Sequence, residues 1–177
     1  TGSETPLPEG TGESMKPVVY HPIGIVRSPF TEPRGTPIQP PAAAGVEGRV
    51  ELEPSHTDGL KDLGGFSHLI LLYHFHLSKP SPLRVRPFMD EESRGVFAMR
   101  GPSRPNSIGL SIVRLLAIEG ATLRIQDVDI IDGTPLLDIK PYVPQFDSRG
   151  PDGVRIGWLE ENVRKLRTQR DDGRFVK

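Results

Sequence analysis

Short apolar segments separated by glycine- and proline-containing turns occupy most of this chain, and apolar residues recur at helical spacing in only one place. The turns draw on 19 glycines and 19 prolines among 177 residues. Many short strands with a single helix are typical of an antiparallel barrel or sandwich. Strands do not alternate with helices, so a doubly wound α/β fold is not expected. The sequence therefore predicts a mainly β domain.

The strand pattern can be followed segment by segment. Residues 108–118 carry apolar side chains on both parities, which predicts burial on both faces. The Asp132–Pro135 turn predicts a hairpin that joins the strand before it to the strand after it. Residues 28–45 are expected to form a long loop, and 58–63 one helical turn. Strands are expected at 23–27, 46–52, 67–77, 108–118, 123–131 and 136–139, with weaker candidates at Val85 and 94–99.

The two ends of the chain differ from the middle. Residues 1–17 are rich in Gly, Pro, Glu, Ser and Thr, so disorder is expected. Residues 18–150 are expected to form the β domain, and 151–177 a C-terminal helical tail. Its apolar residues predict an amphipathic helix of about three turns, whose apolar stripe covers either the barrel end or a second subunit. They are Trp158, Leu159, Val163 and Leu166.

Charge and composition exclude several classes of protein. The formal net charge is −1, so any nucleic-acid site must be a local patch. The chain has no cysteine, which excludes disulfides, thiolate nucleophiles and Cys-ligated zinc. No apolar run approaches the ~18–20 residues that span a bilayer, and no signal peptide is visible. These features lead us to expect a cytoplasmic protein without a membrane span.

Three histidines share one parity of the strand expected at 67–77: His68, His74 and His76. The His74/His76 pair suits a metal such as zinc, iron or nickel, which would make the domain a metal-binding, cupin-like barrel. The other interpretation is a set of polar side chains that face a cavity or solvent and are held by hydrogen bonds.

Two further clusters have both a plain and a functional interpretation. Arginines gather in the middle of the chain, either as a solvated surface or as a site for phosphate or carboxylate. Prolines stiffen the loop from Arg100 to Asn106, which lowers the entropy cost of binding. The hairpin from Asp132 to Tyr142 carries acid, hydroxyl, amine and phenol groups, either in a plain turn with a salt bridge or on a functional face. The arginines are Arg84, Arg86, Arg94, Arg100, Arg104, Arg114 and Arg124.

Five short motifs occur in order along the chain. They are Gly24-Ile-Val-Arg-Ser-Pro29, Phe66-Ser-His-Leu69, Gly95-Val-Phe-Ala98, Arg104-Pro-Asn106 with Ile108-Gly-Leu-Ser111, and Asp132-Gly-Thr-Pro135 through Asp138-Ile-Lys-Pro-Tyr142. Together they resemble the TsaA-like (YaeB, TrmO) family over residues 20–147. The resemblance implies a compact antiparallel β-barrel that acts as a homodimer. It also implies an S-adenosylmethionine-dependent methyltransferase acting on N6 of threonylcarbamoyl-modified adenosine in the tRNA anticodon loop.

The resemblance also implies site residues, and no metal among them. The cofactor's carboxylate needs an arginine, and its adenine needs an apolar wall. Residues implied to bind the cofactor are Pro33, Arg34, Gly35, His76, Leu77, Arg100, Leu110, Asp132, Gly133, Thr134 and Pro135. Candidate bases for the acceptor proton are His76, Asp138 and Tyr142. Candidate contacts to RNA phosphates are Arg34, Arg84, Arg86 and Arg104.

The chain departs from the family pattern at Gly35, Met99, Gly101, Ser103 and Ser107. These departures bear on the acceptor more than on the cofactor, so another RNA or a small metabolite stays open as the methyl acceptor. Two alternatives from other classes also stay open. One is the cupin-like metal barrel, and the other is a non-catalytic module that senses the cofactor or binds a partner.

Overall fold

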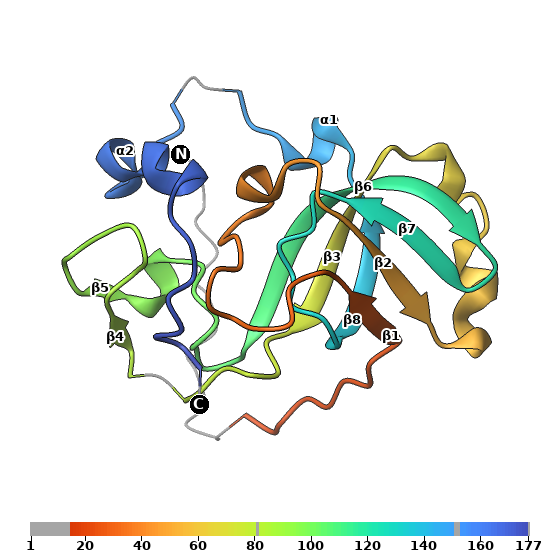
Figure 1. Ribbon diagram of the computed structural model, residues 1–177, viewed down its shortest axis with the longest axis horizontal. Helices are drawn as coiled ribbons and strands as arrows, with labels where there is room; N and C mark the ends of the chain where they lie inside the picture. Colours follow the sequence, from red (N-terminus) through yellow and green to blue (C-terminus); the bar gives the residue numbers. More distant parts are fainter. Residues whose placement is uncertain (1–14, 81, 151–152, 177) are drawn as a thin grey trace, which may run out of the picture.

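Six antiparallel strands close into a barrel (Figure 1). The computed structural model describes residues 15–80, 82–150 and 153–176. The order around the barrel is β1-β2-β7-β6-β3-β8, which confirms the predicted mainly β barrel. The first fourteen residues of the segment predicted to be disordered lie outside the described residues. The strands are β1 (Gly24–Arg27), β2 (Glu47–Leu52), β3 (His68–His74), β6 (Ile108–Glu119), β7 (Thr122–Gln126) and β8 (Thr134–Pro141).

Smaller elements decorate the barrel. A separate two-stranded sheet pairs β4 (Arg84–Val85) with β5 (Arg94–Gly95), where the sequence predicted weak strands. The α-helices are α1 (Pro144–Asp147) and α2 (Leu159–Asn162). No helix in the described part of the chain is long and apolar enough to cross a membrane. The 3-10 helices are η1 (Pro40–Ala43), η2 (Pro54–Leu60), η3 (Leu63–Gly65), η4 (Val96–Ala98) and η5 (Val163–Arg167).

The core fills the inside of the barrel and follows the two-residue period of the strands. On β3, the inward side chains Leu69, Leu71 and Tyr73 are buried. On the neighbouring β6, Ser111 and Val113 also face inward and are buried. Valines, leucines and isoleucines from the other strands complete the interior, including Val26, Val50, Leu123, Ile125 and Leu136.

The opposite face of β6 corrects one prediction. Ile108, Leu110 and Ile112 were expected to be buried, but they remain 43%, 46% and 36% exposed. They point away from the barrel interior and line a cavity instead of packing against a second sheet. Two-sided apolar patterning on this strand therefore reflects a core face and a cavity face.

Two further predictions, both for the segment between β7 and β8, are wrong. Residues 128–131 are not a strand, although Val128 and Ile130 are buried in the core. Asp127 adopts φ +67°, a left-handed conformation that ends β7. β8 pairs with β1 and β3, so the predicted hairpin with the preceding strand is wrong. The irregular stretch carries the chain from β7 to the β1–β3 side of the barrel.

The C-terminal segment is helical for a shorter distance than predicted. In place of three turns, the four-residue α2 continues directly into the 3-10 turn η5. Residues 168–176 then run back along the molecule, between the β4–β5 region and the loop that precedes β2 (Figure 1). Isolated β-bridges pair Pro37 with Arg170 and Ser78 with Val176.

Candidate active site

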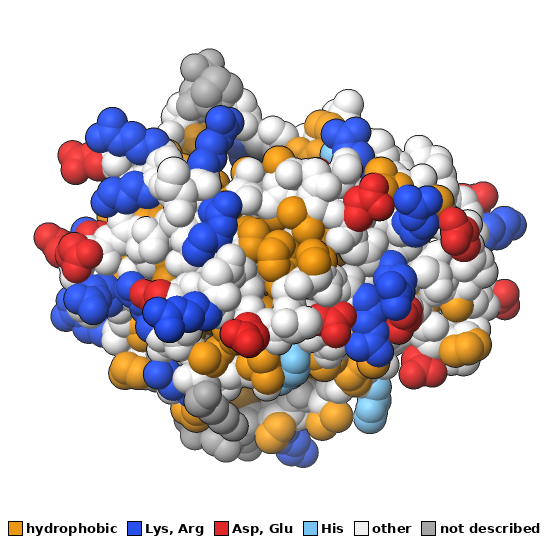
Figure 2. Space-filling view, in the orientation of Figure 1, with side chains coloured by type: hydrophobic (Ala, Val, Ile, Leu, Met, Phe, Trp, Pro, Cys, Tyr) orange, Lys and Arg blue, Asp and Glu red, His pale blue; other side chains and the backbone are white. Residues whose placement is uncertain are grey.

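A cavity of about 1260 Å³ lies between the outward face of β6 and the C-terminal segment. Its walls come from residues 33–44, 75–78, 87–89, 97–106 and 127–134, together with residues of 158–176. Figure 2 shows apolar side chains gathered at the centre of one face of the molecule, with charged side chains of both signs on either side. The cavity is therefore built from segments that are far apart in the sequence.

One wall of the cavity is apolar. It contains Ile108, Leu110 and Ile112 of β6, and Phe97, whose side chain is 77% exposed. Side chains at alternate positions of one strand form a continuous surface. Such a surface suits a heterocyclic ring, while a few polar groups around it fix the orientation.

The arginine–proline loop forms a second wall, and its two arginines differ. Arg104 Nη1 donates to the carbonyl oxygens of Met99 at 2.9 Å and Gly101 at 3.4 Å, so it organises the loop. Arg100 is exposed, and its one described hydrogen bond, to Gln39 Oε1, is long at 3.5 Å. Both side chains line the cavity. Arg100 is therefore the better placed of the two to bind an anionic group.

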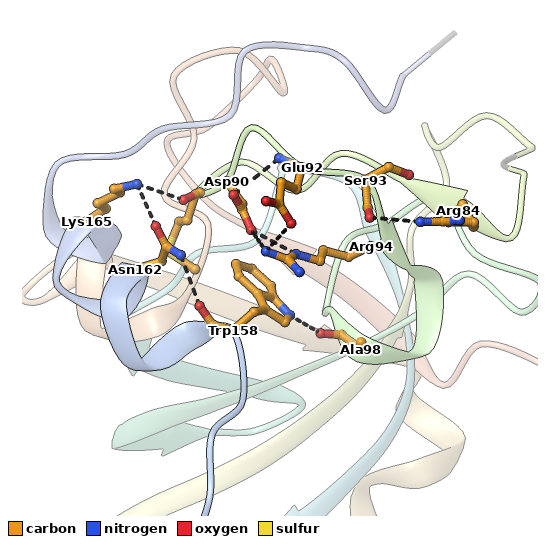
Figure 3. A network of polar contacts seen from close by, with 10 residues as sticks. Arg84, Asp90, Glu92, Ser93, Arg94, Ala98, Trp158, Asn162 and Lys165 are labelled. Atoms are coloured by element: carbon orange, nitrogen blue, oxygen red, sulfur yellow. Dashed lines mark hydrogen bonds and ion pairs between the residues drawn. The ribbon is translucent and has the colours of Figure 1, made fainter.

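The third wall is α2 with η5, which the network in Figure 3 ties to residues 89–98. Trp158 Nε1 donates to the carbonyl oxygen of Ala98 at 2.8 Å, and the Arg94 guanidinium lies 5.7 Å from the centre of the Trp158 ring. Arg94 in turn pairs with Asp90 at 2.6 Å. Lys165 Nζ donates to the carbonyl oxygen of Met89 at 3.1 Å. The helical stripe that the sequence predicted thus lines the cavity through Trp158, Leu159, Val163 and Leu166.

Residues 171–176 form a strap that contacts the cavity loops around Gly35, Lys79 and Ser103. Gly35 N donates to the carbonyl oxygen of Asp171 at 2.7 Å. The carbonyl oxygen of Phe175 accepts hydrogen bonds from Lys79 N and from Ser103 Oγ, both at 3.0 Å. The Phe175 ring is buried and packs edge-to-face on Phe88 at 4.9 Å. Sequence reasoning missed this strap, although an apolar pair, Phe175 and Val176, in an otherwise polar tail signals an anchor.

A buried polar chain reaches the cavity from the end of the barrel. Tyr73 OH and Ser111 Oγ are 2.9 Å apart, and Ser111 Oγ donates to Asp129 Oδ1 at 2.6 Å. Tyr73 and Asp129 both line the cavity. Burial raises the pKa of Asp129 to about 7, and burial together with the Asp129 charge raises the pKa of Tyr73. Sequence reasoning missed all three, although polar residues at inward positions of strong strands are an available signal.

Several residues that the resemblance implied do meet at the cavity. The side chain of Thr134 is buried, and its hydroxyl donates to the carbonyl oxygen of Ile131 at 2.7 Å. His76 follows the end of β3, and burial, with a smaller effect of His74, lowers the pKa of its imidazole. Seven predicted residues line the cavity: Pro33, His76, Leu77, Arg100, Arg104, Leu110 and Thr134.

Apart from Thr134, the residues of the Asp132–Pro135 turn do not line the cavity. Asp132 Oδ1 accepts a hydrogen bond from Ser28 N at 3.2 Å, and Oδ2 lies 3.6 Å from Arg27 Nη1. Gly133, at φ +79°, donates its N–H to Val26, and Pro135 pairs with Ile25 of β1. The turn therefore contributes Thr134 to the cavity, while Asp132 joins a smaller polar hollow beside β1 and β2.

Other predicted residues lie outside the cavity lining. Asp138 pairs with Lys140 at 2.8 Å, and the Tyr142 ring packs near His68 at 6.3 Å. Arg34 and Gly35 are exposed next to the lining residue Pro33. Arg84 and Arg86 are exposed near β4, where Arg84 donates to Ser93 and Arg86 pairs with Glu91.

The histidine pair has few potential partners for a metal. His74 is exposed at the end of β3, and His76 lines the cavity on the turn that follows. In residues 15–80, 82–150 and 153–176, no group of three or more His, Cys, Asp or Glu side chains could hold a metal ion.

Comparison with known proteins gives a consistent family. The tRNA-methyltransferase O N-terminal domain family matches residues 25–148. A probable S-adenosyl-L-methionine-binding protein of Pyrococcus abyssi is 61% identical over 158 residues, covering 89% of this chain and 85% of that protein. The human tRNA (adenine(37)-N6)-methyltransferase is 36% identical over 140 residues, covering 74% of this chain but only 31% of the human protein.

A solved structure agrees with the sequence relatives. The crystal structure of TrmO from Pseudomonas aeruginosa superposes with a TM-score of 0.68 at 40% identity. The superposition covers 80% of this chain and 62% of the TrmO chain. The family match spans most of the barrel and includes two of the cavity walls, the apolar wall on β6 and the arginine–proline loop, whereas α2 and η5 follow it in the sequence. This chain therefore belongs to the tRNA-methyltransferase O N-terminal domain family.

Proposed function

We propose that this protein is an S-adenosylmethionine-dependent methyltransferase that modifies an adenosine of tRNA. The observation that carries the proposal is the single cavity at which Pro33, His76, Arg100, Leu110 and Thr134 meet. These residues are far apart in the sequence, and the family resemblance implies each of them as a cofactor contact. The relatives named as S-adenosyl-L-methionine-binding proteins and as tRNA methyltransferases support the same reading.

The cavity suits a nucleoside that carries an amino acid. The apolar wall with Leu110 fits an adenine ring, and Arg100 fits the carboxylate. The backbone around Thr134 is held rigidly by its own hydrogen bonds. Pockets for a single drug-sized ligand measure roughly 300–1,000 Å³, whereas this cavity measures about 1260 Å³. The difference leaves room for an acceptor base beside the cofactor.

When bound, S-adenosylmethionine supplies an electrophilic methyl group on a sulfonium. The protein's part is to bind donor and acceptor in line and to keep water out. The stiff Arg100–Asn106 loop and the C-terminal wall serve these two purposes. Of the three candidate bases, His76 is the one that lines the cavity. Burial lowers its pKa and so favours the neutral imidazole, which can hydrogen-bond a ligand in the cavity.

The acceptor in this proposal is the threonylcarbamoyl-modified adenosine of the anticodon loop, on the strength of the family resemblance. Exposed arginines on the side of α2, β4 and β5, where Figure 2 shows Lys and Arg among acidic side chains, support a path for the RNA backbone. Arg34, Arg84 and Arg86 remain proposed phosphate contacts because they are exposed. Arg104 is engaged with loop carbonyls, so we propose a positioning role for it in addition to phosphate binding.

We also propose that the protein is a cytoplasmic homodimer. Leu116, an apolar side chain exposed on β6 outside the cavity lining, supports a self-association surface. Sedimentation of a Leu116→Lys variant tests the dimer, with Leu83→Lys as a control at another exposed leucine that lies outside β6. Dissociation by the first variant alone is expected, and a wild-type monomer would contradict the proposal.

The direct test of function is methyl transfer from labelled S-adenosylmethionine to tRNA, followed by mass spectrometry of the nucleosides. The expected product is the modified adenosine with one additional methyl group. tRNA that lacks the threonylcarbamoyl group is the matched control and should gain none. Absence of S-adenosylmethionine binding in calorimetry would contradict the proposed function as a whole. Cofactor binding without tRNA methylation would favour a different acceptor.

A further inference from the structure

The family resemblance assigned no role to the hydrogen-bonded chain of Tyr73, Ser111 and Asp129 at the cavity. Tyr73 and Ser111 belong to adjacent strands, β3 and β6, and Asp129 lies in the irregular segment before β8. Tyr73 and Ser111 are buried, whereas Asp129 keeps part of its surface at the cavity. A barrel interior made of Val, Leu and Ile would pack as well without these groups. Their position at the cavity therefore indicates a chemical role.

The hydrogen bonds give this chain a direction. Ser111 has one hydroxyl hydrogen, which it donates to Asp129 Oδ1 at 2.6 Å. Tyr73 OH, at 2.9 Å from Ser111 Oγ, is then the donor to Ser111. Both hydroxyls thus point their hydrogens toward Asp129. The arrangement orients the carboxylate of Asp129, a residue that lines the cavity.

From this geometry we propose that Asp129 is the proton acceptor of the reaction, with Ser111 and Tyr73 as its positioning residues. This inference rests on the proposed function. In the transfer, the acceptor nitrogen gains the methyl group, the methyl–sulfur bond breaks with its electron pair left on sulfur, and Asp129 takes the N–H proton. The protonated carboxyl then returns the proton to water when the product leaves.

The electrostatics of the site suit this role. Burial raises the pKa of the Asp129 carboxyl to about 7, and the Ser111 hydrogen bond opposes that rise. A base with a pKa close to the working pH combines a large ionised fraction with a useful affinity for the proton. Among the ionisable side chains around Asp129, Tyr73 of β3 is the one linked to it through Ser111. The other ionisable side chains on the cavity wall are His76, Arg100, Arg104, Asp127 and Asp171.

The experiment compares wild type with Asp129→Asn, which keeps the shape of the side chain but removes its basicity. Cofactor affinity is measured by calorimetry, and the single-turnover methylation rate is measured from about pH 5 to about pH 9. The wild-type rate should rise with pH through an ionisation near the Asp129 pKa and then level off. Asp129→Asn should bind the cofactor as wild type does, lose about a hundredfold or more in rate, and lose the pH-dependent rise.

A second variant, Ser111→Ala, tests the same inference if Asp129→Asn does not fold. Ser111→Ala leaves the carboxyl in place but removes a hydrogen bond that lowers its pKa. The rise in rate should therefore move to higher pH, and the carbon-13 NMR titration of the Asp129 carboxyl in the absence of RNA should move with it. A purely structural role for these residues would still shift the carboxyl titration, but the rate would fall equally at every pH and its pH dependence would not move with the titration.

A pH-dependent rise that survives in Asp129→Asn would overturn the inference, and its loss in His76→Asn would then assign the ionisation to His76. This result leaves the proposed function intact, because wild type still methylates tRNA. Failure of the wild type to bind S-adenosylmethionine is a separate outcome that would overturn the function itself.

Discussion

Tyr73 lies so close to Gly109, its partner on the neighbouring strand, that a Cβ atom at Gly109 would fall 2.2 Å from Cε2 of the tyrosine ring. No real side chain tolerates this distance, so glycine is required for Tyr73 to reach Ser111. The contact links the backbone of β6 to the polar chain that ends at Asp129.

Gly109→Ala is therefore expected to displace the Tyr73 ring. Overpacking of this kind lowers the free energy of unfolding by about 1–3 kcal/mol, which urea denaturation would measure. Gly95→Ala is the matched control, because a Cβ atom there meets nothing within 4 Å. Equal stability of the two variants would show that the ring moves freely.

Arg100 and Arg104 should respond differently to removal. Arg104→Ala leaves the carbonyls of Met99 and Gly101 without their donor, so it should lower the free energy of unfolding by about 1–3 kcal/mol. Arg100→Ala should leave stability unchanged and weaken S-adenosylmethionine binding by about tenfold or more, as expected for loss of a charge-assisted hydrogen bond. Thermal denaturation and calorimetry together measure both effects. A common effect of the two variants would contradict the division of roles.

Phe175→Ala tests the C-terminal strap. A buried phenylalanine contributes about 3–5 kcal/mol. The strap contacts the rest of the molecule through isolated β-bridges and not through a sheet, so it should detach locally while the barrel stays folded. Hydrogen exchange should then become faster at Gly35 and Lys79, whose amides donate to the strap. Cofactor binding should weaken in parallel. Phe146→Ala is the control because its ring is 76% exposed, and it should change neither quantity.

Asp129 should also make stability depend on pH. Burial raises its pKa from 3.8 in the unfolded chain to about 7. The folded state therefore binds more protons than the unfolded state between these values, and stability falls as pH rises through that window. Urea denaturation of wild type should show this decline relative to Asp129→Asn, which has no such ionisation. Parallel pH profiles for the two proteins would mean that the carboxyl stays ionised throughout.

The arginines near β4 should act on RNA affinity and not on the cofactor. Removing both Arg84 and Arg86 should weaken tRNA binding and reduce its dependence on salt concentration, because fewer counterions are released. Filter binding at several salt concentrations would measure the slope. Arg124→Ala is a control at a charged residue on the barrel strand β7, paired with Glu47. A slope that changes only in the control would move the RNA path to the other side of the barrel.

Local patterns predicted the barrel well. Two-residue alternation located β2, and the apolar run at 67–77 located β3, because these strands have one consistently buried face. The pattern was misleading on β6, where Leu110 and its neighbours face a cavity and not a core. The partners of β8 were not predictable, because pairing with β1 and β3 depends on contacts that are distant in sequence.

The site was only partly predictable for the same reason. The family resemblance located loop residues such as His76 and Arg100, which do line the cavity. It placed Asp132 with them, but that carboxylate points toward Arg27 and Ser28. The Phe175 strap and the Asp129 chain could not be predicted, because each depends on hydrogen bonds to residues more than fifteen positions away in the sequence.

The most direct test of the central claim is a crystal structure of the protein with S-adenosylmethionine. Density for the nucleoside is expected against Leu110 and near Thr134, with the carboxylate within hydrogen-bonding distance of Arg100. Density in the polar hollow beside Arg27 and Asp132, with the large cavity filled by solvent, would contradict this claim.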